Sequence, residues 1–119
     1  MKKILIIDDE PIIITLITTL LESKGYCVLS ASKGKEGMTI AEKLMPDLII
    51  LDYHLPDFNG MEVFCMLKGN SKTQDIPVFL FTANTYEDDI GKLRKLGCRI
   101  FEKPVKTKDF IKEINKILH

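Results

Sequence analysis

The sequence predicts an α/β protein in which a parallel sheet of five strands carries helices on both faces. Short apolar runs alternate with longer segments of helical spacing, and this alternation repeats five times along the 119 residues. The runs are rich in Ile, Leu, Val and Phe, which is typical of strands covered on both sides. Alternating units of this length imply right-handed crossover connections, and such connections join parallel strands.

The predicted strands are the apolar runs themselves. They cover residues 4–7, 26–31, 48–51, 78–81 and 98–102. The predicted helices carry apolar residues three and four positions apart. They cover residues 11–23, 34–45, 60–68, 85–96 and 107–118.

Residues near the helix ends support these boundaries. Pro11 suits a first helical turn behind an acidic cap. Glu87, Asp88 and Asp89 fall in the expected first turn of the fourth helix, where negative charge complements the helix dipole. Thr107 is the expected N-cap of the last helix.

Length and composition limit the class of protein. With 119 residues and 45% hydrophobic content, residues 1–119 are expected to form one domain with its own core. The 17 basic and 17 acidic residues balance, which argues against nucleic-acid binding through bulk charge. No apolar segment approaches the roughly 18 residues that a membrane-spanning helix needs. The three cysteines lack C-x-x-C spacing, so we expect buried free thiols in a cytoplasmic protein rather than a zinc or thioredoxin-like site.

Polar residues follow four of the predicted strands. They are Asp8, Asp9, Asp52, Thr82 and Lys103. Ligands of an open parallel sheet bind beyond the carboxyl ends of its strands, so we expect these side chains to meet at one edge. Each alone is explained more simply as a turn former, a helix cap or a surface residue, but their joint occurrence at one edge is not.

The chemistry of this set favours phosphoryl transfer. Three carboxylates in one cleft repel one another, and a hard divalent cation such as Mg²⁺, or Mn²⁺ in its place, relieves that repulsion. Asp9 and Asp52 are the candidate direct ligands, and Asp8 can hold a coordinated water. Lys103 supplies a point charge for an oxyanion and Thr82 a hydroxyl donor. Asp52 would then be the nucleophile that forms an acyl phosphate.

Several motifs resemble those of a known family. They are the pair Asp8-Asp9, the run D-Y-H-L-P-D-F-N-G from Asp52 to Gly60, Thr82-Ala83 and Lys103-Pro104. Together they resemble the response-regulator receiver domain, the CheY-like phosphoacceptor module of two-component signalling, over the whole chain. The resemblance implies a flavodoxin-like sheet with strand order 2-1-3-4-5.

The resemblance also implies roles for single residues. Asp52 would accept a phosphoryl group from a histidine kinase, a phosphotransfer protein or a small acyl phosphate. Asp9, Asp52 and the backbone carbonyl of His54 would coordinate Mg²⁺, with Asp8 acting through water. Lys103 and Thr82 would bind the phosphoryl oxygens. The peptide bond between Lys103 and Pro104 is expected to be cis.

The family transmits its signal through the face formed by the fourth helix, the fifth strand and the fifth helix. Phosphorylation shifts this face between conformations and so controls a partner or an effector domain, and a homodimer can form there. The coupling aromatic of the family is replaced here by Ile100. Phe101 points to the opposite side of the strand, so no aromatic rotamer switch is expected.

Three other functions fit the sequence less well than that of a phosphoacceptor module. An aspartyl phosphohydrolase needs a second carboxylate two residues after the nucleophile, where this chain has His54, and a cap domain. A flavodoxin-like cofactor binder needs a phosphate loop after the first strand. A receiver-shaped scaffold would not need an intact acceptor set. His54 and Asn84 are expected to tune water access to the phosphoryl group, although for His54 a plain exposed loop side chain is an equal alternative.

Overall fold

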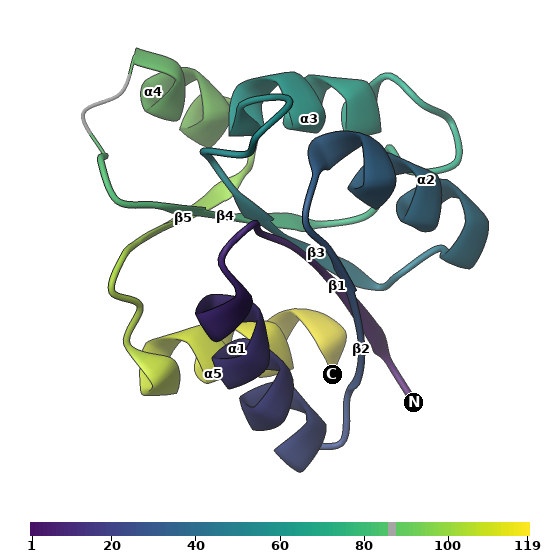
Figure 1. The fold of residues 1–119 in the computed structure, drawn as a ribbon, viewed down its shortest axis with the longest axis vertical. Helices are drawn as coiled ribbons and strands as arrows, with labels where there is room; N and C mark the ends of the chain where they lie inside the picture. The colour runs from purple at the N-terminus through teal and green to yellow at the C-terminus, as the bar shows by residue number, and fades with distance from the viewer. Residues whose placement is uncertain (86–87) are drawn as a thin grey trace.

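The structure is a computed structural model that describes residues 1–85 and 88–119, and it shows a five-stranded parallel sheet between two helical layers (Figure 1). In chain order its elements are β1 (Lys3–Ile7), α1 (Pro11–Ser23), β2 (Cys27–Ala31), α2 (Gly34–Leu44), β3 (Leu48–Asp52), α3 (Gly60–Lys68), β4 (Val78–Thr82), α4 (Asp88–Lys95), β5 (Arg99–Glu102) and α5 (Thr107–Leu118). The strands lie in the order β2-β1-β3-β4-β5, which confirms the predicted flavodoxin-like arrangement.

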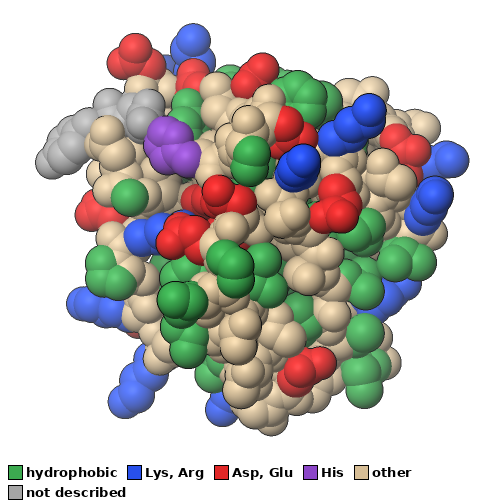
Figure 2. Space-filling view, in the orientation of Figure 1, with side chains coloured by type: hydrophobic (Ala, Val, Ile, Leu, Met, Phe, Trp, Pro, Cys, Tyr) green, Lys and Arg blue, Asp and Glu red, His purple; other side chains and the backbone are tan. Residues whose placement is uncertain are grey.

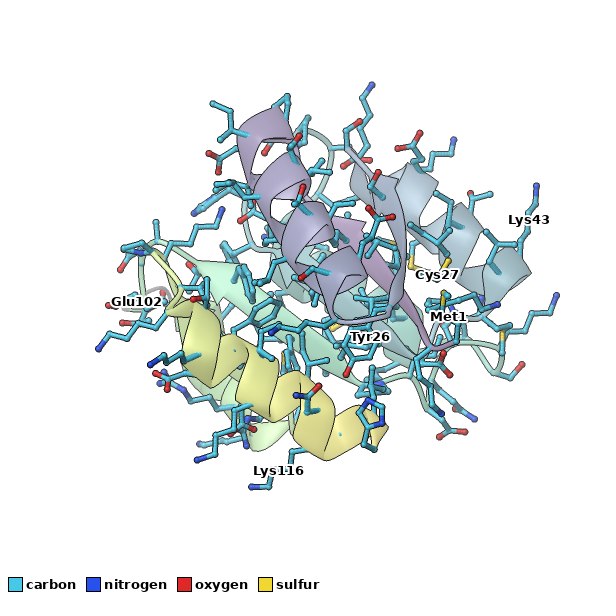
Figure 3. All side chains as sticks on the ribbon, turned by 90° about the horizontal axis from the view of Figure 1, so that it is seen from below. Met1, Tyr26, Cys27, Lys43, Glu102 and Lys116 are labelled. Atoms are coloured by element: carbon cyan, nitrogen blue, oxygen red, sulfur yellow. The ribbon has the colours of Figure 1, made fainter. Side chains whose placement is uncertain are left out.

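The helices divide between the two faces of the sheet. Helices α1 and α5 cover one face, which Figure 3 views directly, and α2, α3 and α4 cover the other. Strand β1 shows why the apolar runs are continuous: Ile4 and Ile6 pack toward α1 and α5, whereas Leu5 and Ile7 pack toward α2 and α3. All four side chains are fully buried, so each face of the strand contributes to a hydrophobic core.

Most helix boundaries agree with the sequence, and the exceptions have local causes. Helix α2 ends at Leu44 because Met45 adopts a left-handed conformation with φ of 47°. Helix α3 begins with a capping box in which the Asn59 side chain accepts from the Glu62 amide and the Glu62 carboxylate accepts from the Asn59 amide. This capping box was not among the features predicted from the sequence.

The prediction that Thr107 caps the last helix is wrong. Lys106 occupies the N-cap position and Thr107 is the first helical residue. Asp88 and Asp89 form the first turn of α4, as expected. Glu87, also expected in that turn, lies outside the described residues.

The loop after β3 is tied to α2. The carboxylate of Asp57 accepts hydrogen bonds from the amides of Gly34 (2.8 Å) and Lys35 (3.0 Å), and so caps the N-terminus of α2. Desolvation of Asp57 opposes its ionisation, but hydrogen bonds from the amides of Lys35 and Gly34, together with those of Asp57 and Phe58, outweigh it and lower the pKa of the carboxyl. The segment that follows Asp52 is therefore anchored to a neighbouring helix.

The expectation that the three cysteines are buried free thiols is met only in part. Cys98 is buried, and burial raises the pKa of its thiol to about 12, whereas Cys27 is half-buried and Cys65 is exposed on α3. The expectation of a buried thiol is therefore wrong for Cys65. Within residues 1–85 and 88–119, no helix combines the length and apolar character needed to cross a membrane.

Candidate functional site

Strand register brings the polar residues at the carboxyl ends of β1 and β3 to one edge of the sheet. Ile7 pairs with Leu51, so Asp8 and Asp52 both lie one residue beyond the same rung of the parallel ladder. Thr82 pairs with Glu102, and the amide of Lys103 donates to the Thr82 carbonyl at 2.8 Å. The carboxyl ends of β1, β3, β4 and β5 therefore deliver these residues to a common cleft.

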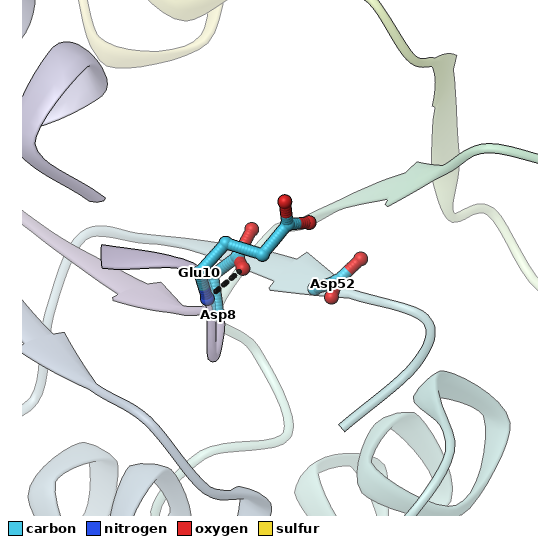
Figure 4. Close-up of side chains that lie close together, drawn as sticks. All are labelled: Asp8, Glu10 and Asp52. Atoms are coloured by element: carbon cyan, nitrogen blue, oxygen red, sulfur yellow. Dashed lines mark hydrogen bonds between the residues drawn. The ribbon is translucent and has the colours of Figure 1, made fainter. Parts of the chain in front are cut away.

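Three carboxylates converge in this cleft. Oxygens of Asp8, Glu10 and Asp52 lie within 4.8 Å of one another, and Figure 4 shows the three side chains side by side. The Asp8 carboxylate also accepts from the Glu10 amide at 2.9 Å, drawn as the dashed line in Figure 4. This bond shapes the turn from β1 into α1 and directs Glu10 back toward the cleft.

Lys103 is the cation of the cleft. Its Nζ lies 3.0 Å from Glu10 Oε1, 3.1 Å from Asp52 Oδ1 and 3.6 Å from Asp8 Oδ2. The side chains of Asp8 and Asp52 are only 3% and 6% exposed, while Glu10 is 57% exposed. The Lys103 ammonium therefore lies close to two buried carboxylates and to a third carboxylate at the rim of the cleft.

Burial shifts the acid–base properties of the cleft. Desolvation, reinforced by the charge of Asp8 and opposed by Lys103, raises the pKa of Asp52 to about 6. Desolvation also raises the pKa of Asp8. Burial disfavours the ammonium of Lys103, but its hydrogen bond to Glu10 and the charges of Asp52 and Asp8 outweigh this, so the pKa of Lys103 is raised. The cleft thus holds more negative charge than Lys103 alone compensates.

Thr82 lies at the same edge but is engaged within its own loop. Its side chain is fully buried, and its hydroxyl donates to the Asn84 carbonyl at 3.2 Å and accepts from the Asn84 amide at 3.1 Å. A local turn of this kind holds the hydroxyl in place, so a ligand of Thr82 has to replace the Asn84 contacts.

The positions of Asp9 and Glu10 differ from the expectation that Asp9 lies in the cleft. Asp9 is exposed and its carboxylate lies outside the cluster formed by Asp8, Glu10 and Asp52. Its charge nevertheless contributes to the raised pKa of Asp8 and of Asp52. Glu10 was not predicted as a site residue, although its place as the third acid after β1 was a signal for it.

His54 begins the turn after the candidate nucleophile. It forms an isolated antiparallel bridge with Asn59, its side chain is exposed, and its ring lies edge-on to Tyr53 with centroids 4.9 Å apart. The role of its carbonyl as a metal ligand stays a prediction. The peptide bond between Lys103 and Pro104 is cis, as the resemblance implied.

The carboxylate cluster fits a hard divalent cation. Carboxylate oxygens are the preferred ligands of Mg²⁺, and clustered carboxylates gain most when a cation compensates their repulsion. The raised pKa values of Asp8 and Asp52 show that this repulsion and desolvation are present. Asp8, Glu10 and Asp52 are the residues whose carboxylate oxygens already lie close enough together to surround such an ion or its coordinated water.

An apolar groove borders the cleft. It runs between α1 and α5, and its lining includes Ile13, Leu16, Val105 and Phe110, with Lys103 at its edge. Ile12 and Leu16 of α1 are strongly exposed. Figure 2 shows acidic side chains gathered beside hydrophobic ones on this face. We call this feature the α1/α5 groove.

The fold and the acidic cleft at the carboxyl edge of the sheet can now be compared with known proteins. Residues 4–115 match the response regulator receiver domain family. The chain is 34% identical to protein PilH of Pseudomonas aeruginosa over 119 residues, covering 99% of this chain and 98% of PilH. The chain therefore belongs to the response regulator receiver domain family, whose members are signalling domains of two-component systems.

Solved structures show the same architecture. The chemotaxis response regulator CheY4 of Vibrio cholerae superposes with a TM-score of 0.88 at 25% identity, covering 98% of each chain. The receiver domain of the sensor histidine kinase PA1611 from Pseudomonas aeruginosa also gives a TM-score of 0.88 at 25% identity, covering 99% of this chain and 98% of that one. That structure has a magnesium ion coordinated in its active-site cleft.

The raised pKa of Asp52 predicts a pH-dependent gain of stability in Asp52→Asn. Because the folded-state pKa of about 6 exceeds the ordinary 3.8, the contribution of Asp52 to stability is fully present below pH 3.8 and is lost as the pH rises through about 6. At pH 7 the wild type carries this cost and the variant does not. We expect the variant to raise the free energy of unfolding by about 1–3 kcal/mol at pH 7 and by only about 0.5 kcal/mol near pH 4.

Urea unfolding in the presence of EDTA, at both pH values, measures this difference. Asp75→Asn is the matched control, because Asp75 is exposed just before β4, at the opposite edge of the sheet. The control should stay within about 0.5 kcal/mol of the wild type. An Asp52→Asn protein that is less stable than the wild type at pH 7 would show that the ion pair with Lys103 outweighs the burial cost.

Proposed function

We propose that this receiver domain takes a phosphoryl group on Asp52 and thereby switches a partner or effector domain. The observation that carries the proposal is the placement of Asp52, a buried carboxylate with Lys103 Nζ at 3.1 Å, at the carboxyl edge of the sheet in a member of the receiver family. In this proposal residues 1–119 act as one receiver unit. It catalyses only its own phosphorylation and dephosphorylation and turns over no external metabolite.

Asp52 is the nucleophile of the proposed transfer. One of its carboxylate oxygens forms a bond to phosphorus while the bond from phosphorus to the donor's nitrogen or oxygen breaks. Lys103 is close enough to neutralise the phosphoryl oxygens as they arrive. Thr82 adds a hydroxyl donor once it leaves Asn84. The reaction requires Asp52 as a carboxylate, so its rate should rise with pH through the pKa of that group.

The proposed metal ligands are Asp8, Asp9, Asp52 and the backbone carbonyl of His54, with Asp8 acting largely through water. When bound, Mg²⁺, or Mn²⁺ in its place, would neutralise charge on the phosphoryl oxygens and on the acceptor carboxylate. Asp8 and Asp52 already lie together, whereas Asp9 has to turn inward from its exposed position. Magnesium in the cleft of the PA1611 receiver domain supports this part of the proposal.

The proposed donor is the phosphohistidine of a histidine kinase or of a phosphotransfer protein. Receiver domains as a family work with such proteins, and the proposal extends this to the present chain. The α1/α5 groove supports a protein donor, because exposed apolar surface beside an ionic site is typical of protein contacts. A cytoplasmic location, where such donors act, stays a prediction.

Treatment with acetyl phosphate and Mg²⁺ should add one labile phosphoryl group to the protein. Intact-mass spectrometry measures the adduct, which we expect to be absent without Mg²⁺ and absent in Asp52→Asn. Asp75→Asn, at the far edge of the sheet, should be labelled as the wild type is. An Asp52→Asn protein labelled to the wild-type extent would contradict the assignment of the nucleophile, and release of phosphate from many unrelated esters would favour a phosphohydrolase.

We further propose that phosphorylation repacks the face formed by α4, β5 and α5, the α4-β5-α5 face. The structure agrees with the sequence on strand β5: Ile100 packs toward α4, while Phe101 packs against Phe79, Phe81 and Phe110 on the opposite side. An aromatic switch at position 100 is therefore absent. A homodimer through this face stays a prediction.

Tyr53 supports another connection from the acceptor to this face. It directly follows Asp52, its ring is buried, and its hydroxyl donates to Asp89 Oδ2 in the first turn of α4 at 2.5 Å. Its carbonyl also accepts from the Gly60 amide at 2.6 Å, so the residue is held at both ends. A displacement of the Asp52 backbone is thus passed to α4 through one rigid side chain.

Tyr53→Phe should weaken the response of α4 without preventing phosphorylation. Hydrogen–deuterium exchange of peptides covering 88–95, with and without acetyl phosphate and Mg²⁺, measures the response. We expect the change seen in the wild type to fall by about half or more, because loss of one half-buried hydrogen bond weakens the attachment of α4 by about 1 kcal/mol. Tyr26→Phe removes a hydroxyl that donates to Asn115 of α5, away from Glu102 at the end of β5 (Figure 3), and is the matched control. An unchanged α4 response in Tyr53→Phe would contradict this route.

A further inference from the structure

We infer that Glu10 holds Lys103 in the unphosphorylated protein and competes with the incoming phosphoryl group for it. Glu10 is then a positioning residue that limits the rate at which Asp52 is phosphorylated. The inference rests on the proposed function of Asp52 and deepens it, because it assigns a regulatory role to a residue at the rim of the same cleft.

The geometry pairs the Glu10 carboxylate with the Lys103 ammonium. Its Oε1 lies 3.0 Å from Lys103 Nζ, as near as the Asp52 oxygen at 3.1 Å and nearer than the Asp8 oxygen at 3.6 Å. Glu10 occupies the N-cap position of α1, yet its side chain makes no capping hydrogen bond. In the described part of the chain, its carboxylate has Lys103 as its hydrogen-bond partner. The side chain thus contributes an ion pair to the cleft rather than a cap to the helix.

The backbone of Glu10 is held while its side chain can leave. The amide of Glu10 donates to Asp8 Oδ1 at 2.9 Å, so the turn that carries the residue is fixed to a buried carboxylate. The side chain itself is 57% exposed, against 3% for Asp8 and 6% for Asp52. Of the three carboxylates around Lys103, that of Glu10 can therefore most readily turn into solvent when another anion arrives.

Competition for Lys103 follows from charge. A phosphoryl group carries close to two negative charges, and its oxygens need the ammonium that Glu10 and Asp52 share. While Glu10 is in place, its own negative charge, within 4.8 Å of the Asp52 carboxylate, also repels the approaching phosphoryl group. Glu10 forms and breaks no covalent bond in the transfer. It acts only through the position of Lys103 and the charge at the mouth of the cleft.

The same cluster admits a different role for Glu10. Its carboxylate lies within 4.8 Å of those of Asp8 and Asp52, so it could serve as a metal ligand instead. The two roles predict opposite effects of Glu10→Gln. Removing a competitor for Lys103 speeds phosphorylation and leaves Mg²⁺ affinity unchanged, whereas removing a ligand weakens Mg²⁺ binding and slows phosphorylation.

The test compares wild type, Glu10→Gln and Glu22→Gln at saturating Mg²⁺. Glu22 is an exposed acid near the other end of α1, so its substitution controls for a change of one charge on the same helix. The rate constant for labelling by acetyl phosphate is measured by intact-mass spectrometry, and the Mg²⁺ dissociation constant by calorimetry. We expect Glu10→Gln to be labelled about 3- to 10-fold faster, as befits a partly exposed charge pair, with Glu22→Gln within about 2-fold of the wild type.

Salt provides a readout that a purely structural role would not change. The ratio of the Glu10→Gln rate to the wild-type rate should shrink toward one as ionic strength rises to about 0.5 M, because salt screens the exposed ion pair. Equal labelling rates for the two proteins at low salt would overturn the inference while leaving phosphorylation of Asp52 intact. Slower labelling with weaker Mg²⁺ binding would overturn it by making Glu10 a ligand. Failure of the wild type to be labelled at all would overturn the proposed function and the inference together.

Discussion

The structure depends on one electrostatic constraint, which is the burial of Asp8 and Asp52 side by side with Lys103 as their nearest cation. Burial raises the pKa of both carboxyls, the charge of Asp8 adds to the shift of Asp52, and the charges of Glu10 and Asp9 add to the shift of Asp8. The negative charge of the cleft is therefore under-compensated even with the lysine in place. A fold does not gain stability from such an arrangement. The free-energy cost of burying these carboxylates is explained if the cleft attracts a divalent cation and presents Asp52 to a phosphoryl donor.

The parallel sheet makes this constraint possible. Because Ile7 and Leu51 share a rung of the ladder, the residues that follow them must lie together, and the cores on both faces hold the strands in that register. Residues in the loops then connect the cleft to the neighbouring helices. Asp57 anchors the segment after Asp52 to α2, and Tyr53 reaches from the position next to Asp52 to Asp89 of α4. The same few residues therefore link the charge of the cleft to two neighbouring helices.

Much of this was predictable from the sequence, because continuous apolar runs and strand-end polar residues reflect a sheet covered on both faces. The strand order, the meeting of Asp8, Asp52 and Lys103, and the cis peptide before Pro104 all follow that logic or the family resemblance. The placement of Glu10 rather than Asp9 in the cleft did not follow from the sequence, since the turn between β1 and α1 depends on a hydrogen bond from the Glu10 amide to Asp8. Which partner a side chain bonds to, as with the Thr82 hydroxyl and Asn84, depends on local geometry that cannot be read from the pattern of residue types.

Chemical trapping of the acyl phosphate tests the central claim most directly. Sodium borohydride reduces an aspartyl phosphate to homoserine, and peptide mass spectrometry then locates the reduced residue. In protein treated with acetyl phosphate and Mg²⁺, we expect homoserine at position 52 and at no other aspartate. Reduction at Asp8 or Asp9 instead, or an adduct on the protein with no reducible aspartate, would contradict the assignment of Asp52 as the phosphoryl acceptor.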